Sequence, residues 1–325
     1  MNTKRLLACL LFPTFLGAAA PSDPARVPDK IPLKLRYPVG TTLYYRIERL
    51  NTGYRLDGTR ISGQKMVAWF TRTRLADDPQ GKVQERFVWK RFEFGQSLTA
   101  APAKPSEFKA ARDFALTLSV NEDMAIEKFD FSSLPRTLDG FFFMILSWDA
   151  VTFDGLVRPT PGLAIPDEAA PGAVFRDPAG REFRFSYLPL VPEARYVFSG
   201  NNWVRLLGLS RVGPIPCALF DSAMLESKVE MALRVAGLEI QTRGFENFWA
   251  KTYLALDDGR ILKGELVGPV SMVQDIRRPG QAAPEHSEFL EIGELTMDLL
   301  SEAEFKAELA QRGDATAAPS PSSIR

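Results

Sequence analysis

The chain has 325 residues, of which 40 are basic, 40 are acidic and one is histidine. This even balance leaves no basic field for a polyanion, which excludes nucleic acid as an expected partner. A single histidine excludes sites that need several imidazoles, and we expect neither a metal nor a cofactor. The chain also has no P-loop, dinucleotide glycine motif, EF-hand loop or nucleophile elbow, so we assign no catalytic residue. Whether the protein is an enzyme stays open, with a non-enzymatic protein favoured.

The first residues have the layout of a secretory signal peptide. Lys4 and Arg5 precede an apolar run over 6–16, and small residues follow at 17–20. The run is shorter than the roughly 20 apolar residues that span a bilayer, so we predict a cleaved signal over 1–19 and no transmembrane span in the mature chain. Cys9 ends a Leu-Leu-Ala-Cys segment that matches a lipoprotein cleavage box. Most of the apolar run follows Cys9 rather than preceding it, which disfavours lipid anchoring. The protein is therefore expected in the periplasm or outside the cell.

The first half of the mature chain reads as β-structure. Residues 20–32 contain four prolines and predict an extended leader. From residue 33 apolar and polar residues alternate, which predicts strands at 43–48, 67–74, 83–89 and 114–120, with a return strand at 124–129. This half runs from about 33 to about 130.

The period then changes to that of a helix. Between 134 and 153 the apolar residues recur at spacings of three and four, and the run over 141–146 is apolar throughout. Pro135 suits the first turn. A helix that is apolar almost all round is buried, which predicts a central helix covered by the sheet.

A second β-rich half is predicted over about 180–300. It includes alternating strands at 183–187, 225–235 and 289–300, and a hairpin over 252–266 that turns at Asp257-Asp258-Gly259. Ser301 and Glu304 form a capping box for a helix that ends near 311, and 312–325 is expected to be a disordered tail. The fold class is mainly β (α+β): one domain over 33–311, with a large curved antiparallel sheet or half-barrel wrapped around the central helix and a short C-terminal helix.

The leader, the Tyr37-Pro38-Val39-Gly40 segment that enters a long strand, and the Asp257-Asp258-Gly259 hairpin resemble exported bacterial β-rich proteins of unknown function. The strand–helix–strand plan over 33–300 is loosely similar to the half-barrel of periplasmic lipoprotein carriers. That resemblance implies a curved sheet that holds acyl chains against a helix. It transfers no binding residue.

We therefore expect a non-enzymatic protein that binds an apolar or amphipathic ligand, a lipid or a lipidated protein, between sheet and helix. The expected ligand-binding residues are Phe141, Phe142, Ile145 and Trp148. One alternative is an envelope scaffold that binds another protein or a polysaccharide through exposed aromatic residues. A second is a carboxylate-dependent hydrolase, which needs two acidic side chains in one site.

Other chemistry-bearing residues have simpler explanations. Cys217 lies in an apolar stretch and is expected to be a buried, inert thiol. His286, with Glu285 and Glu288, is expected in a solvated loop without the rigid geometry of a metal site. Asp257 and Asp258 serve the hairpin turn.

Asp149 and Asp154 are the remaining candidates. They lie near the end of the predicted helix beside aromatic residues, where a carboxyl can have a raised pKa and act as a general acid. Solvation at the helix end is the favoured explanation.

Overall fold

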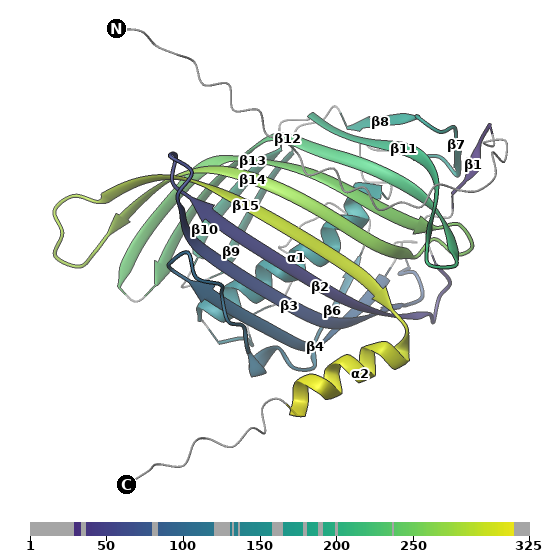
Figure 1. Cartoon of the computed structure of the whole chain (residues 1–325), viewed down its shortest axis with the longest axis horizontal. Helices are drawn as coiled ribbons and strands as arrows, with labels where there is room; N and C mark the ends of the chain where they lie inside the picture. The colour runs from purple at the N-terminus through teal and green to yellow at the C-terminus, as the bar shows by residue number, and fades with distance from the viewer. Residues whose placement is uncertain are drawn as a thin grey trace, which may run out of the picture.

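The computed structural model describes residues 29–33, 37–79, 84–119, 131, 133–135, 137–157, 165–177, 181–187, 191–198, 201–235 and 237–314. Most of them belong to one large antiparallel sheet (Figure 1). The predicted signal peptide, Cys9, the return strand at 124–129 and the tail beyond 314 lie outside the described residues.

The sheet has thirteen strands, which follow the order β5-β4-β3-β2-β15-β14-β13-β12-β10-β9, with β6 beside β4, β11 beside β12 and β8 beside β11. Its strands are β2 (Thr42–Tyr54), β3 (Arg60–Arg74), β4 (Gln84–Ser97), β5 (Ser106–Glu107), β6 (Phe114–Ser119), β8 (Val174–Asp177), β9 (Arg181–Tyr187), β10 (Val191–Phe198), β11 (Asn201–Val212), β12 (Ile215–Val235), β13 (Leu238–Ala255), β14 (Ile261–Arg277) and β15 (Glu285–Leu300). A small second sheet pairs β1 (Ile31–Pro32) with β7 (Glu168–Ala169). The order of the large sheet does not return on itself among the described residues, so the sheet is open.

The prediction of a mainly β fold with antiparallel pairing is confirmed, and most of the predicted strands are longer in the structure than the sequence indicated. The two predicted halves share one sheet, because β2 from the first half pairs with β15 from the second. The hairpin around Asp257-Asp258-Gly259 joins β13 to β14 as predicted, with Gly259 at φ 78°. Glycine tolerates this left-handed conformation without a steric penalty.

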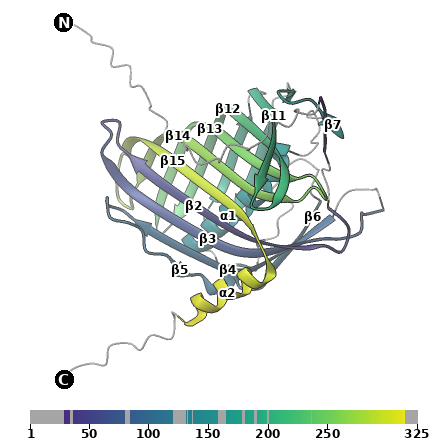
Figure 2. The ribbon, with the colours of Figure 1, turned by 45° about the vertical axis from the view of Figure 1, so that its right-hand side comes forward.

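Two α-helices accompany the sheet, α1 (Leu138–Val157) and α2 (Glu302–Asp314). In both views α1 lies behind the strands, whereas α2 lies at the lower edge of the front side (Figures 1 and 2). The predicted first helix was placed four residues too early. Pro135 precedes α1, and the hydroxyl of Thr137 accepts a hydrogen bond from the Gly140 backbone N–H at 3.3 Å, as an N-cap does. Neither helix of the described chain is long and apolar enough to cross a membrane.

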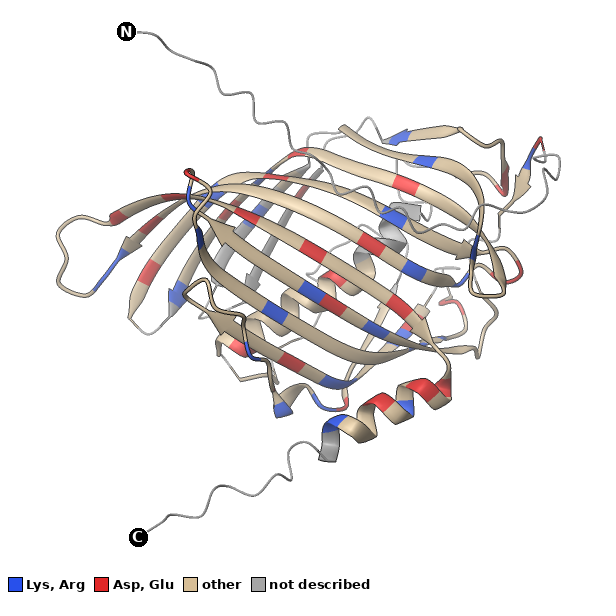
Figure 3. Cartoon of the chain, in the orientation of Figure 1, with Lys and Arg blue, Asp and Glu red and all other residues tan. Residues whose placement is uncertain are grey.

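The two faces of the sheet are chemically distinct. We call inner the face that carries the main apolar core and α1, where Tyr45, Ile47 and Phe70 are buried. We call outer the opposite face, where Trp69 packs with Phe305 of α2. Successive side chains of a strand point to opposite faces, so each strand contributes alternately to both. Acidic and basic residues are interspersed along the strands, as Figure 3 shows.

The longest predicted alternation, over 225–235, is correct only from Ser227 onward. Glu226 has a φ of 58° at a β-bulge, where the β12–β13 register shifts between Met224 and Ser227. A bulge inserts one residue and reverses which residues point inward. Phe220 and Met224 therefore face inward before the bulge, and Ser227 and Val229 face inward after it.

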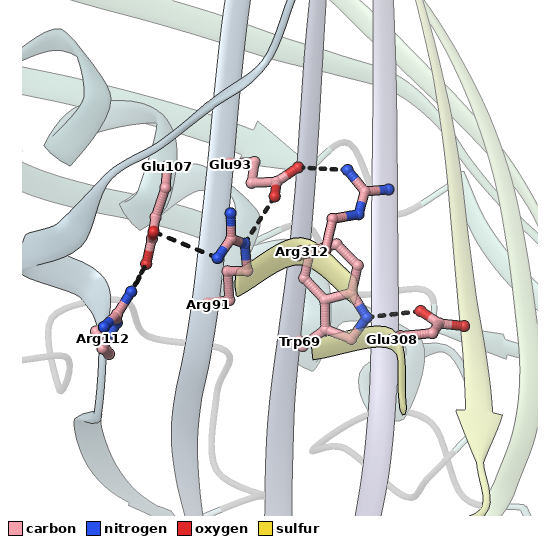
Figure 4. Close-up of polar contacts among 7 residues, drawn as sticks. All are labelled: Trp69, Arg91, Glu93, Glu107, Arg112, Glu308 and Arg312. Atoms are coloured by element: carbon pink, nitrogen blue, oxygen red, sulfur yellow. Dashed lines mark hydrogen bonds and ion pairs between the residues drawn. The ribbon is translucent and has the colours of Figure 1, made fainter. Parts of the chain in front are cut away.

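Helix α2 docks on the outer face through polar contacts (Figure 4). The indole N–H of Trp69 donates to Glu308 Oε2 at 2.7 Å, and Arg312 pairs with Glu93 at 2.9 Å and lies 5.2 Å from the Trp69 ring centroid. The capping box is confirmed, since Ser301 N donates to Glu304 Oε2 at 2.8 Å and Glu304 N to Ser301 Oγ at 3.2 Å. The helix runs to Asp314, three residues beyond its predicted end.

A chain of ion pairs continues from Glu93 across the neighbouring strands. Arg91 bridges Glu93 at 2.7 Å and Glu107 at 3.3 Å, and Glu107 also binds Arg112 at 2.5 Å (Figure 4). With Trp69 and Glu308 these residues fix α2 to one edge of the outer face. The two helices therefore lie on opposite faces of the sheet, α2 on the outer face and α1 on the inner face.

Candidate functional site

Phe143 anchors α1 to the inner face. Its side chain is fully buried, and its ring centroid lies 5.4 Å from that of Trp89 and 5.3 Å from that of Phe92, in edge-on geometries. Phe114 and Phe131 add edge-on contacts at 5.6 Å and 6.2 Å. Such pairs contribute about 0.5–1.5 kcal/mol each beyond the apolar area they bury. The aromatic richness of this chain therefore serves first to hold the helix in place.

A different stripe of α1 keeps part of its surface exposed. Phe142, Ile145, Trp148 and Asp149 are half-buried, while Phe141 is 5% exposed. Residues 142, 145 and 149 are three and four positions apart, so they lie on one face of the helix, and residue 148 lies next to them. The stripe is directed at the sheet, because Phe142 stacks on Phe94 of β4 at 4.5 Å. Three of the four predicted ligand-binding residues thus share one partly accessible stripe, and Phe141 lies on the buried side.

The polar end of this stripe is an ion pair to the sheet. Arg49 of β2 donates through Nη1 to Asp149 Oδ2 at 2.7 Å and through Nε to Asn51 Oδ1 at 2.8 Å. The two charged side chains are 13% and 16% exposed. Gly293 of β15 makes room for them, since a Cβ there would lie 3.1 Å from Asn51 Oδ1 and 3.5 Å from Arg49 Nη2. A larger residue would press on the guanidinium.

Two more carboxylates on the inner face, those of Glu246 and Glu291, act electrostatically on Arg49. In the register of the sheet, Ser227 of β12 is opposite Glu246 of β13, Glu246 is opposite Val270 of β14, and Val270 is opposite Glu291 of β15. Cross-strand neighbours share a face. We call Arg49, Asp149, Ser227, Glu246 and Glu291 the inner-face polar cluster.

Two members of the cluster lack hydrogen-bonding partners. Ser227 is fully buried, and its Oγ has no hydrogen-bond partner among the described residues. Glu291 is partly buried and makes no hydrogen bond or ion pair with the described part of the chain. Buried hydroxyls are usually hydrogen-bonded, so Ser227 calls for an explanation.

The charges of the cluster shift one another's pKa values. Burial raises the pKa of Asp149 above its ordinary value, although the adjacent Arg49 opposes this shift. Burial likewise raises the pKa of Glu291, again against the field of Arg49. Burial alone would lower the pKa of Arg49, but Asp149, Glu246 and Glu291 together raise it. Arg49 is therefore a fixed positive charge, and Asp149 and Glu291 are the groups with raised pKa values.

This arrangement limits the chemistry that the cluster can perform. The described residues contain no group of three or more His, Cys, Asp or Glu side chains that could hold a metal ion. A carboxyl with a raised pKa can act as a general acid, which is the property that the hydrolase alternative requires. A carboxylate can also bind a cation or a hydrogen-bond donor of a ligand without any reaction.

The favoured explanation for Asp149, solvation at the helix end, is wrong. Asp149 lies inside α1, largely buried and paired with Arg49. The side chain of Asp154 lies outside the described residues. The sequence singled out Asp149 because aromatic residues flank it. It offered no signal for Arg49, Ser227, Glu246 or Glu291, which sit in ordinary strand alternation.

The remaining candidates are structural or exposed. Cys217 is fully buried as predicted, and burial raises the pKa of its thiol to about 11. Asp258 binds Arg260 within the hairpin, which confirms its turn role. His286 is exposed as predicted, but it belongs to β15 rather than to a loop, because it pairs with Asp275 across the β14–β15 ladder. The hydrogen bond between the His286 ring Nδ1 and the Asp275 carboxylate, which accepts it, raises the pKa of His286.

No protein-family model and no curated protein matches the chain. Among solved structures it is similar to a Nitrosomonas europaea protein provisionally named AttH, with 10% identity over 77% of this chain and 92% of that protein and a TM-score of 0.23. It is also similar to a variant porin of Rh. blastica (9% identity, 80% and 100% covered, TM-score 0.19) and to OprB of Pseudomonas putida (10% identity, 80% and 94% covered, TM-score 0.17). TM-scores this low assign neither a fold nor a function to this chain.

Proposed function

We propose that this protein is an exported, periplasmic or secreted binding protein without enzymatic activity. Its ligand is an apolar or amphipathic molecule, a lipid or the lipid group of a modified protein. The ligand lies between the inner face of the sheet and α1, with the sheet curved around the helix.

Contacts of α1 with distant strands support the curved arrangement. The helix contacts β3 and β4 on one side of the strand order and β12 and β13 on the other, while β2, β15 and β14 lie between them. A single straight helix reaches both groups most readily across a curved sheet. Strand twist and the bulge at Glu226 both favour such curvature.

The observation that carries the proposal is the half-buried stripe of α1. Phe142, Ile145 and Trp148 pack against the main apolar core and still keep exposed surface. Apolar side chains that only stabilised the fold would gain more from complete burial, at about 25 cal/mol per Å². A partly exposed apolar stripe that ends in charged groups suits a ligand with an apolar body and a polar end.

Native mass spectrometry tests the proposal directly. The full chain would be purified without detergent from a bacterial envelope, its mass measured under native conditions, and any bound molecule extracted into organic solvent. A stoichiometric small molecule with an apolar body supports the proposal. A protein that carries nothing, and that also fails to take up added octan-1-ol, would overturn it.

One observation favours a second candidate, an envelope interaction protein. On the outer face Trp249 is 42% exposed and lies opposite Val267, also 42% exposed, and Phe245 is 52% exposed on the same strand. Exposed aromatic residues grouped in this way are typical of interaction sites. Crosslinking in the envelope through Trp249, compared with the exposed Lys251 on the same face, tests this candidate. If this candidate is correct, a crosslinker at Trp249 should capture one dominant partner, and a crosslinker at Lys251 should not.

A further inference from the structure

We propose that α2 is a strap that leaves the outer face as a unit while the sheet stays folded, and that charged contacts control its release. Release uncovers an apolar patch of the sheet, formed by Tyr44, Val67 and Trp69. The strap lies on the outer face, away from the ligand proposed for the inner face.

Apolar packing holds α2 at a single fully buried residue. Among the described side chains of the helix only Phe305 is buried, and most of the others are exposed. Phe305 packs with Val67 and Trp69, and its ring centroid lies 5.3 Å from that of Tyr44. Most helices in proteins owe their stability to the burial of a whole apolar face. With one buried residue, α2 is held less firmly than a helix of the core.

Charged side chains make further contacts between α2 and the sheet. Glu308 pairs with Arg46 at 3.3 Å and accepts a hydrogen bond from the Trp69 indole N–H at 2.7 Å. Arg312 pairs with Glu93 at 2.9 Å and lies over the Trp69 ring (Figure 4). Arg46, Glu308 and Arg312 are 36%, 29% and 49% exposed, so dissolved ions reach these pairs. Salt screens such exposed charges, so a higher ionic strength weakens the docking of α2.

The sheet does not need α2 to pair these charges. Arg46 also pairs with Asp298 at 2.9 Å, and Glu93 also pairs with Arg91 at 2.7 Å. Both residues therefore keep an ion pair within the sheet when the helix leaves. Release avoids the high cost of an unpaired buried charge.

The connection between α2 and the sheet is short and lies beyond the strand pairing. β15 pairs with β2 as far as Leu300, which lies opposite Tyr44, and α2 begins at Glu302. Ser301 alone joins the two elements. Rotation of the backbone at Ser301 can therefore move α2 without breaking the sheet.

Release changes the chemistry of the outer face. Val67 and Trp69 are 2% and 1% exposed while α2 is docked. Without Phe305 above them, they form with Tyr44 the kind of apolar patch that monomeric proteins keep small. The position of α2 thus decides whether this patch reaches solvent.

Hydrogen exchange of the full-length protein, followed by mass spectrometry, measures the release. A helix of this length is marginal in water on its own, so the amides of a released α2 exchange. We expect the amides of 305–312 to exchange about tenfold faster at about 1 M NaCl than at about 0.05 M NaCl. The amides of β13 and β14 should keep their rates.

Two substitutions assign the effect to the charged contacts. Arg312→Gln removes the pair with Glu93 and should speed the exchange of α2 about fivefold at low salt, with β13 and β14 unchanged. Lys306→Gln is the matched control, because Lys306 is exposed and pairs with Glu302 of the same helix. It should leave the exchange of α2 within about twofold of the wild-type rate.

Two results would overturn the proposal. If the amides of α2 exchange as slowly as those of β13 and β14 at both salt concentrations, the helix opens only when the whole protein unfolds. If α2 exchanges faster than the sheet but responds neither to salt nor to Arg312→Gln, charged contacts do not control its release.

Discussion

Arg49 of β2 and Asp149 of α1 form an ion pair of 2.7 Å between positions 100 residues apart in the chain. This ion pair ties α1 to β2, a strand near the middle of the sheet order. A buried ion pair stabilises a fold little compared with well-packed apolar residues, but breaking one is costly. The pair therefore fixes where α1 lies and brings charge to the region in which we place the ligand.

We predict that Arg49→Met destabilises the protein by about 3 kcal/mol, because it leaves Asp149 as an unpaired, largely buried charge. The double variant Arg49→Met with Asp149→Leu should recover most of this loss, since it removes both charges. Urea unfolding of the two variants and the wild type measures the difference. A single variant as stable as the wild type would show that the pair does not hold the helix.

The contribution of Asp149 and Glu291 to the stability of the protein should fall as the pH rises through the carboxyl range. The pKa values of Asp149 and Glu291 are raised in the folded state by burial, so the folded protein holds their protons more tightly than the unfolded chain. Their contribution to the free energy of unfolding is therefore complete below the ordinary carboxyl pKa and is lost as the pH rises through the raised values. Glu291→Gln should stabilise the protein at about pH 7 and weaken this pH dependence.

Urea unfolding of the wild type and Glu291→Gln at about pH 4.5 and about pH 7 checks this sign. Glu294→Gln is the control, because Glu294 lies on the same strand but is exposed on the outer face. A Glu291→Gln variant that is less stable than the wild type at neutral pH would mean that the Glu291 carboxylate is favourably paired in the folded protein.

Substitutions of Phe143 and Phe142 should distinguish a residue that stabilises the fold from one that also binds the ligand. Phe143→Ala removes a fully buried ring from the aromatic cluster and should cost about 4 kcal/mol in urea unfolding. Phe142→Ala removes a half-buried ring, so we expect a loss of about 2 kcal/mol and at least tenfold weaker binding of octan-1-ol. Unchanged octan-1-ol binding by a folded Phe142→Ala variant would place the apolar site elsewhere.

The docking of α2 on the outer face should depend on Glu308. The Trp69 side chain is only 1% exposed, and its indole N–H donates to Glu308. Glu308→Ala removes this acceptor and should lower the free energy of unfolding by about 1–2 kcal/mol. Glu302→Ala, which removes the exposed pair with Lys306 and a hydrogen bond with Tyr44, should cost less than about 1 kcal/mol. Equal effects of the two substitutions in thermal unfolding would show that Glu308 acts only as a surface charge.

Local signals in the sequence predicted much of this fold. The Asp257-Asp258-Gly259 turn and the Ser301–Glu304 capping box depend on residues next to one another, and both were placed correctly. The bulge at Glu226 was missed, because the left-handed φ there belongs to a residue type that gives no local sign of it. Short strands such as β5 and β7 were missed for a similar reason, since two residues carry no periodicity.

The candidate site was predictable only in its helical part. Phe142, Ile145 and Trp148 could be chosen because the apolar run over 141–146 stands out in one segment. Arg49, Glu246 and Glu291 could not, because each looks like an ordinary charged residue of an alternating strand. Their proximity depends on the strand order β2-β15-β14-β13, which no local pattern encodes.

A crystal structure of the protein with octan-1-ol tests the proposed binding of an apolar ligand between the sheet and α1. We expect the alkyl chain to lie along Phe142, Ile145 and Trp148. Octan-1-ol bound only to the outer face, or bound along a path that avoids α1, would overturn the proposed function.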